Sequence, residues 1–219
     1  MTRPDTPEAS NLNIPGTSSL SAWTRIHERI VSYRAETERI VGTQNFNTSA
    51  QILDLACGTG EHLIEAARLG YCCTGVDRQE WKLERARKDA LALRLEIKFL
   101  CADMRSLQVA PVYDLVVCLY ALSMMTADTD IAAVLETADR ALRPGGSFVF
   151  NVLNKQALLD RDAQDPLPRS DAHLRAFDPD EIVHFTRQAG FVVHDLAMFD
   201  VAGTRALDIF VSARRATFP

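Results

Sequence analysis

The sequence has few of the features that place a protein on nucleic acid, in a membrane or outside the cell. Its 24 lysines and arginines are outnumbered by 29 aspartates and glutamates, so the net charge is -5 and no overall basic field favours nucleic acid or anionic lipid. No apolar run reaches the roughly 18 residues of a membrane span, and no early positive cluster precedes an apolar stretch as in a signal peptide. We therefore expect a cytoplasmic protein with neither nucleic-acid nor membrane partners.

Cysteine is also scarce. The odd count of five, with no metal-type pairs, argues against a disulfide framework and a metal site. We interpret the cysteines as small buried hydrophobic residues in a reducing compartment. Two of them lie near the expected cleft, but no proline-cysteine loop or suitably placed histidine marks either as a nucleophile. The five are Cys57, Cys72, Cys73, Cys101 and Cys118.

What the chain does contain is an apolar run that stops at a pair of glycines. It reads Ile52-Leu53-Asp54-Leu55-Ala56-Cys57-Gly58-Thr59-Gly60 and continues into a helical pattern. This pattern predicts a strand, a tight loop and a helix start. Glycines let the backbone adopt a positive φ and let a ligand approach closely, as in the βα units that bind nucleotide-like cofactors.

The loop lacks the third glycine of a dinucleotide fingerprint, because Leu63 occupies that position. Glu61 already places a carboxylate at the helix N-terminus, where a pyrophosphate would otherwise bind. A second strand ends at Asp77, 19 residues after Gly58 and close to the roughly 20-residue spacing of a ribose-binding acid. Ribose next to a cationic group favours a cofactor other than NAD.

Four motifs in this order resemble those of class I S-adenosylmethionine-dependent methyltransferases. The resemblance implies an α/β, doubly wound, mostly parallel seven-stranded sheet with an antiparallel C-terminal edge strand, in a Rossmann-like methyltransferase fold. It covers residues 50–152 firmly and the C-terminal part more loosely, and it identifies no methyl acceptor. The motifs are Asp54 to Gly60, Gly75-Val76-Asp77, Ala102-Asp103-Met104 and Leu142-Arg143-Pro144-Gly145-Gly146.

The resemblance also implies a cofactor, S-adenosyl-L-methionine, and residues that bind it. Asp77 would hold the ribose, Asp103 would accept a hydrogen bond from the adenine amino group, and the Met104 amide would meet a ring nitrogen. For Asp103 the alternative is a capping role in the turn that follows. Arg78 is open to three interpretations: stacking on adenine, pairing with an acid, or solvation. The predicted cofactor-binding residues are Asp54, Ala56, Gly58, Thr59, Gly60, Asp77, Arg78, Asp103, Met104, Leu119, Trp23 and Tyr33.

The proline-rich and polar residues 1–18 predict a flexible tail, and residues 19–219 predict a single methyltransferase domain. Within it, spacing predicts a helix over 19–42 that carries Trp23, Ile26, Ile30 and Tyr33 on one face. In the family the corresponding helix often closes over the cofactor. The two isoleucines fit a packing role, whereas the two aromatic residues fit a lid equally well.

The acceptor side is less distinctive. Tyr120 and Ser123 are polar points in an apolar segment, and the Asn-Pro-Pro-aromatic run of enzymes that methylate base amino groups is absent. This segment suits a small, partly hydrophobic acceptor. Residues 154–176 are crowded with charge and predict an acceptor-side flap. The candidate bases are Tyr120, His173 and His27.

The sequence therefore predicts transfer of a methyl group from S-adenosylmethionine to a nitrogen, oxygen or carbon nucleophile of a small molecule, by a monomer or homodimer. A non-catalytic S-adenosylmethionine-binding partner subunit remains an alternative because the candidate bases are weak. An NAD-dependent oxidoreductase is disfavoured by Leu63 and Glu61. Methylation of RNA or protein is disfavoured by the net negative charge.

Overall fold

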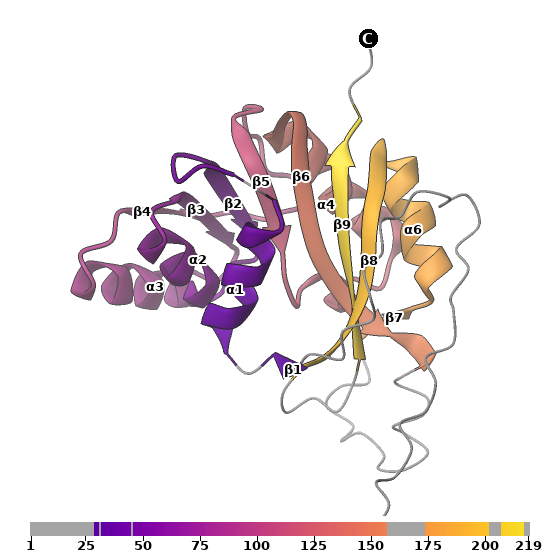
Figure 1. Ribbon diagram of the computed structural model, residues 1–219, viewed down its shortest axis with the longest axis horizontal. Coiled ribbons are helices and arrows are strands. Elements are labelled where there is room, and N and C mark those ends of the chain that lie inside the picture. The colour runs from indigo at the N-terminus through magenta and orange to yellow at the C-terminus, as the bar shows by residue number, and fades with distance from the viewer. Residues whose placement is uncertain (1–28, 31, 45, 157–173, 202–206, 217–219) are drawn as a thin grey trace, which may run out of the picture.

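A computed structural model describes residues 29–30, 32–44, 46–156, 174–201 and 207–216. A single twisted sheet forms the centre of the molecule, with α1, α2 and α3 on one face and α4 and α6 on the other (Figure 1). The predicted doubly wound α/β architecture is confirmed. Among the described residues, no helix is long and apolar enough to cross a membrane.

The first half of the sheet follows the predicted alternation of strands and helices. Its strands pair in parallel, so their carboxyl ends meet at one edge. The helices that connect the strands pack against one face of the sheet, and Leu83 and Ala86, which lie between β3 and β4 in the chain, are fully buried. The elements are β2 (Gln51–Leu55), α2 (Glu61–Arg68), β3 (Cys72–Asp77), α3 (Glu80–Ala92) and β4 (Ile97–Cys101).

The second half continues the alternation and ends in two long strands. Asp178 precedes α6, with Pro179 at the first helical position and Glu181 Oε2 accepting from the Asp178 amide at 3.4 Å, which is the helix start that the sequence predicts. The elements are β5 (Tyr113–Cys118), the short helix η1 (Leu122–Met124), α4 (Asp128–Ala141), β6 (Leu142–Asn154), β7 (Ala176–Phe177), α6 (Pro179–Gln188), β8 (Phe191–Val201) and β9 (Leu207–Arg215).

The sheet has the order β1-β8-β9-β6-β5-β2-β3-β4. The C-terminal strand β9 is antiparallel to both of its neighbours, as predicted, and it lies inside the sheet between β6 and β8. The described strands include the seven predicted and two of two residues each, β1 (Arg29–Ile30) beside β8 and β7 beside β6. Because β6 and β9 are antiparallel, the carboxyl end of β6 pairs with the start of β9.

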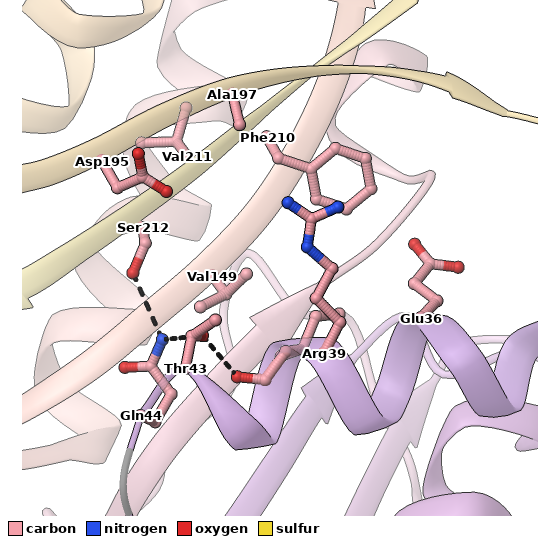
Figure 2. Close-up of a pocket in the computed structure, with 11 residues that line it drawn as sticks. Glu36, Arg39, Thr43, Gln44, Val149, Asp195, Ala197, Phe210, Val211 and Ser212 are labelled. Atoms are coloured by element: carbon pink, nitrogen blue, oxygen red, sulfur yellow. Dashed lines mark hydrogen bonds between the residues drawn. The ribbon is translucent and has the colours of Figure 1, made fainter. Parts of the chain in front are cut away.

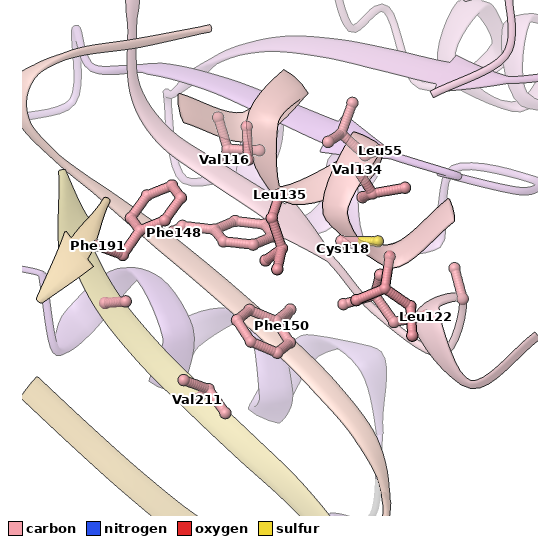
Figure 3. Close-up of a cluster of buried hydrophobic side chains, with 14 of the residues drawn as sticks. Leu55, Val116, Cys118, Leu122, Val134, Leu135, Phe148, Phe150, Phe191 and Val211 are labelled. Atoms are coloured by element: carbon pink, nitrogen blue, oxygen red, sulfur yellow. The ribbon is translucent and has the colours of Figure 1, made fainter. Parts of the chain in front are cut away.

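Side chains of the central strands alternate between two cores. On one face Leu53, Leu55 and Val116 pack with α4 and α6, and Figure 3 shows the aromatic part of this core around Phe148 and Phe150. Those two rings stack with centroids 4.8 Å apart. On the other face the intervening residues pack with α1, α2 and α3. This period of two is the pattern of strands that are covered on both sides.

Several local predictions need correction. The predicted helix over 19–42 is not continuous, because Arg29 and Ile30 form β1 and α1 spans Tyr33–Gly42. Residues 1–28, including the predicted tail, lie outside the described residues, as do 157–173 of the predicted flap. Cys72 and Cys101 are exposed rather than buried. Residues 143–146 form the predicted turn as a bulge within β6, where the register shifts against β5.

Candidate functional site

A pocket of about 270 Å³ opens at the carboxyl ends of β2, β3, β4 and β5. Parallel α/β sheets bind ligands at this edge, because the strand ends and the loops that follow them converge there. Six of the predicted site residues line the pocket together, although they come from three of the four motifs and from the segment after β5. They are Ala56, Asp77, Arg78, Asp103, Met104 and Tyr120, and the other lining residues are Val76, Gln79, Lys82, Ala102, Arg105, Ala121, Met124, Met125, Thr126 and Asp130.

The loop after β2 bends sharply beneath this pocket. Gly58 and Gly60 have φ of 57° and 83°, and Ala56, which has a Cβ, has φ of 67°. A Cβ on Gly60 would lie 3.1 Å from Cβ of Ala86, so this position needs glycine for both its conformation and its packing. Left-handed backbone costs a non-glycine residue about 1–2 kcal/mol, and such strain gathers at functional sites.

Asp77 ties the end of β3 to this loop. Its carboxylate is buried and accepts hydrogen bonds from the Gly58 amide at 3.0 Å and the Gln79 amide at 2.9 Å. Each carboxylate oxygen has a second lone pair, so the group can still accept from a ligand hydroxyl. Asp77 therefore has the position and the free acceptor capacity expected of a ribose-binding acid.

Asp103 also lines the pocket, and Arg105 holds its carboxylate through several hydrogen bonds. Arg105 Nη2 donates to Asp103 Oδ2 at 2.6 Å and its Nε donates to Oδ1 at 3.0 Å, while Nη1 donates to Asp130 at 3.0 Å. The Arg105 amide also donates to Oδ1 at 2.9 Å. These bonds lower the pKa of Asp103 to about 2, so the carboxylate stays ionised as an acceptor. Sequence reasoning missed Arg105, whose position two residues after Asp103 was the available signal.

Tyr120 is held in a strained conformation at the end of β5. Its φ is 56°, its amide donates to Asn151 Oδ1 at 2.6 Å, and its hydroxyl donates to Glu36 Oε1 at 2.7 Å. Asn151 donates in turn to Asp208 Oδ2 at 2.8 Å. Burial and the nearby Glu36 carboxylate raise the pKa of Tyr120. The structure therefore places Tyr120 as a hydrogen-bond donor, which opposes the predicted role of its side chain as an isolated base.

Glu36 and His62 join this cluster, and the sequence prediction included neither. Burial raises the pKa of Glu36 to about 7 and lowers the pKa of His62 to about 4. His62 Nε2 lies 3.6 Å from Glu36 Oε2, and its Nδ1 shares a hydrogen bond with Thr37 Oγ1 at 3.1 Å. The signals were present: Glu36 follows Tyr33 by one helical turn, and His62 directly follows the glycine loop.

Other predicted residues lie beside the pocket rather than in its wall. Asp54 and Leu119 line a cavity of about 20 Å³ beneath the loop, and burial with nearby acids raises the pKa of Asp54. Thr59 donates to Glu61 within the loop. Tyr33 is half exposed on α1, with its ring edge-on to His62 at 5.0 Å. Trp23, His27 and His173 lie outside the described residues.

A cavity of about 40 Å³ separates α1 from strands β6, β8 and β9 (Figure 2). Glu36 lies at one end of the row of α1 side chains in this view, and Arg39 extends toward the ring of Phe210. At the other end Gln44 donates to Ser212 at 3.4 Å. A cavity of this volume can hold one or two water molecules, so we do not assign it a cofactor or a substrate.

The thiols near the site are not activated. Cys57 and Cys118 are buried, and burial raises the pKa of each, as it raises the pKa of Cys73 to about 12. A thiol with a raised pKa carries little of the thiolate that acts as a nucleophile. The predicted packing role of Cys57 and Cys118 agrees with this environment.

Comparison with known proteins adds to this geometry. Residues 52–146 match the family model described as a methyltransferase domain. A ubiquinone biosynthesis O-methyltransferase from Idiomarina loihiensis is 30% identical over 158 residues, which are 68% of this chain and 63% of that protein. The chain therefore spans less than two thirds of this relative's length.

Solved structures share the fold. A S-adenosylmethionine-dependent methyltransferase from Clostridium acetobutylicum superposes with a TM-score of 0.72 at 16% identity, covering 86% of this chain and 94% of that one. The cyclase SpnF superposes with a TM-score of 0.68 at 18% identity, covering 84% and 81%. These matches confirm the resemblance of this chain to class I S-adenosylmethionine-dependent methyltransferases, in its motif region and in its fold.

Proposed function

We propose that this protein transfers a methyl group from S-adenosylmethionine to a nucleophilic atom of a small molecule. The observation that carries the proposal is the convergence of Ala56, Asp77, Asp103 and Met104 on one pocket at the carboxyl edge of the sheet. These residues come from separate motifs, and the fold brings them together in the order that the resemblance implies. The chemistry of each then matches one part of an adenosyl ligand.

The residues present fit the proposed cofactor. Asp77 retains acceptor capacity for ribose hydroxyls, and Asp103 is held ionised to accept from an exocyclic amine. A Cβ placed on Gly58 would meet nothing within 4 Å, which leaves the loop backbone open to a ligand. When bound, S-adenosylmethionine supplies an already activated methyl group. The protein's contribution is then chiefly alignment, which can amount to about 7–11 kcal/mol.

The acceptor side of the pocket is lined mainly by apolar side chains. Met124 and Met125 line it together with Ala121 and Tyr120. Such a surface suits a small, partly hydrophobic acceptor, and methionine adapts to irregular shapes. The O-methyltransferase match favours a hydroxyl as the accepting group. We further propose that residues 154–176 contribute to the acceptor side. The support is a hydrogen bond of 2.7 Å from the amide of Arg175, within this segment, to the carbonyl of Ser123, which precedes Met124 of the pocket.

The fold alone does not determine the activity, because a cyclase has the same fold. A non-catalytic cofactor-binding subunit therefore stays an alternative to an enzyme. We favour the enzyme because Ala121, Met124 and Met125 add an apolar part to the pocket beside the polar residues that would hold the cofactor. We also propose a cytoplasmic location, which the composition favours, and a monomeric or dimeric state.

Two measurements test the proposal. Isothermal titration calorimetry compares S-adenosylmethionine with NAD, and we expect binding of the first only. Single-turnover incubation with methyl-labelled donor and a small-molecule extract then follows, and we expect label in at least one extracted compound. Binding of NAD alone would overturn the proposal, and tight donor binding without any transfer would favour the subunit.

A further inference from the structure

Glu36 is a buried acid that the proposed chemistry has not used. Its side chain is 3% exposed on α1, and its two oxygens face Tyr120 Oη at 2.7 Å and His62 Nε2 at 3.6 Å. Neither partner is a cation at neutral pH. The tyrosine hydroxyl is uncharged, and burial lowers the pKa of His62 to about 4, so its ring is neutral. An ionised Glu36 therefore accepts a hydrogen bond from the uncharged Tyr120 through one oxygen, while its other oxygen faces the neutral ring of His62.

The charged groups around Glu36 are mostly acidic. Asp208 on β9 raises the pKa of Glu36 and Arg39 on α1 lowers it, both less than burial does. Glu36 in turn acts on Asp54 in β2, together with Asp77 of β3 and Glu61 of α2. Among the described residues, His62 on α2 and Tyr120 after β5 contact Glu36, Tyr33 on α1 lies against His62, and Asp195 on β8 lines the same small cavity as Glu36.

This arrangement leaves buried negative charge in excess at one end of the pocket. Asp208 is 3% exposed, and its Oδ1 has no hydrogen-bond partner among the described residues, while its Oδ2 accepts from Asn151. Burying a carboxylate without compensation is costly, so such a site either takes up protons or binds a cation. Protonation and cation binding oppose each other. Protonation removes the negative charge that attracts a cation, and a bound cation stabilises the ionised carboxylate against protonation.

Tyr120 connects Glu36 to the ligand pocket. Tyr120 lines the pocket with Ala56 and Asp77, and its hydroxyl donates to Glu36 directly. If Asp77 holds ribose and Asp103 holds adenine, the part of the donor beyond the ribose faces the end where Ala56 and Tyr120 lie. That part of S-adenosylmethionine carries the sulfonium, whereas S-adenosylhomocysteine has an uncharged sulfur.

We propose that Glu36 is the counter-charge that lets this site distinguish the cationic methyl donor from its neutral-sulfur product. The inference rests on the proposed function. When Glu36 is ionised, the site favours the donor. When Glu36 is protonated, that preference falls, and the product competes more effectively. Methyl transfer removes the sulfonium charge, and this loss favours protonation of Glu36. Protonation of Glu36 in turn weakens the preference of the site for the donor over the neutral-sulfur product.

The test is the ratio of the two affinities as a function of pH. Calorimetry on the full chain gives Kd for S-adenosylmethionine and for S-adenosylhomocysteine between about pH 5.5 and about pH 8.5, a range that brackets the titration of Glu36. We expect the preference for the donor to rise about tenfold with pH, the size of a charge interaction across roughly 10 Å at an effective dielectric constant of about 20. Replacing product with donor at about pH 7 should also release up to about half a proton per site.

Matched variants attribute the effect. Glu36→Gln keeps the shape and the acceptor for Tyr120 and should flatten the ratio. Glu38→Gln removes an equal charge from an exposed position on the same helix, where Glu38 pairs with Arg34 at 2.8 Å, and should leave the ratio as in the wild type. Tyr120→Phe removes a hydrogen bond to the ionised form and should move the midpoint to higher pH.

Each outcome is decisive. A wild-type ratio that is flat with pH overturns the inference without any variant, so the conclusion stands even if Glu36→Gln does not fold. A dependence on pH that persists in a folded Glu36→Gln variant assigns it to another acid, such as Asp208, and also overturns the inference. Binding of neither compound contradicts the proposed function instead, and this result is distinct from the other two.

Discussion

The two ends of the pocket are built differently. At the adenosine end, Asp77 is the last residue of β3 and Asp103 lies two residues after β4, and successive motifs of the chain deliver them. At the end around Tyr120, the contacts join α1, β6 and β9 through residues that are far apart in the chain. The first end depends on local loop geometry, whereas the second depends on long-range packing and on buried charge.

This difference has an energetic consequence. Asp77 and Asp103 accept hydrogen bonds largely from neighbouring backbone or from Arg105, so their placement survives changes elsewhere. Tyr120 has a left-handed backbone that is held by Asn151 and Glu36, so its position depends on every member of the network. Changes at the adenosine end should therefore affect ligand binding, and changes in the network should affect stability.

The largest expected effect is on the network. Asn151→Leu removes the acceptor for the Tyr120 amide and the donor to Asp208, and it leaves both buried groups unsatisfied. We expect the free energy of unfolding to fall by about 4 kcal/mol. Urea denaturation measures it, with the exposed Gln188→Leu as the control. A loss as small as that of the control would mean that Asn151 does not hold Tyr120.

At the adenosine end the effect should appear in affinity. Asp77→Ala removes the acceptor for ribose and the support of the Gly58 amide. We expect S-adenosylmethionine to bind about 100-fold more weakly, or about 3 kcal/mol, with a smaller change in stability because relief of repulsion with Asp54 offsets lost hydrogen bonds. Calorimetry measures the affinity, and Asp89→Ala on the exposed face of α3 is the control. Unchanged affinity in the folded variant would exclude the assigned role of Asp77.

Arg175 tests whether the acceptor side is held by tertiary contacts. Its guanidinium donates to Asp128 at 2.6 Å and to Glu181 at 2.5 Å, and it lies over the rings of Phe177 and Phe185 at 4.7 and 5.5 Å. Arg175→Met should lower the free energy of unfolding by about 2 kcal/mol, because two ion pairs lose their shared partner.

The control for this prediction is Arg85→Met, which breaks an exposed i,i+4 pair with Asp89 on α3. Exposed pairs of this kind contribute little, so its denaturation curve should stay close to the wild type. Equal losses in the two variants would show that Arg175 is no more important than a surface residue.

The smallest effect is a dependence of stability on pH. The pKa of Glu36 is raised to about 7 in the folded chain, so its contribution is complete below its unfolded pKa and is lost as the pH rises through about 7. Asp195, whose pKa burial raises to about 7, acts in the same direction. His62 acts in the opposite direction, and only below about pH 6.5, because its folded pKa is about 4.

Between about pH 6.5 and pH 8, Glu36 should therefore lower the free energy of unfolding by about 1 kcal/mol. Denaturation at both pH values should show a smaller fall of the free energy of unfolding in Glu36→Gln than in the wild type. Part of the fall should remain in that variant, because Asp195 still titrates. An equal fall in the variant and the wild type would place the titration on other groups.

Much of the fold was predictable because its signals are local. The strands β2 and β5 are buried apolar runs, β3 ends at an acid, and the helix after Asp178 begins with a cap and proline. The helix over 19–42 failed for a tertiary reason. Arg29 and Ile30 pair with β8, and Ser32 then caps a new helix by accepting from the Ala35 amide at 3.2 Å. Strand pairing with a segment 171 residues later overrides a helical spacing.

By itself, the sequence determined the order of strands and helices, the glycine loop, and the acids at the ends of β3 and β4, because each depends on residues that are neighbours in the chain. Only the tertiary structure decided that Glu36, Tyr120, Asn151 and Asp208 form one network, and that β9 lies between β6 and β8. Those contacts join positions 31–84 residues apart, and their burial raises the pKa values of Glu36 and Asp208. Burial and long-range pairing are properties of the folded chain, and no local pattern encodes them.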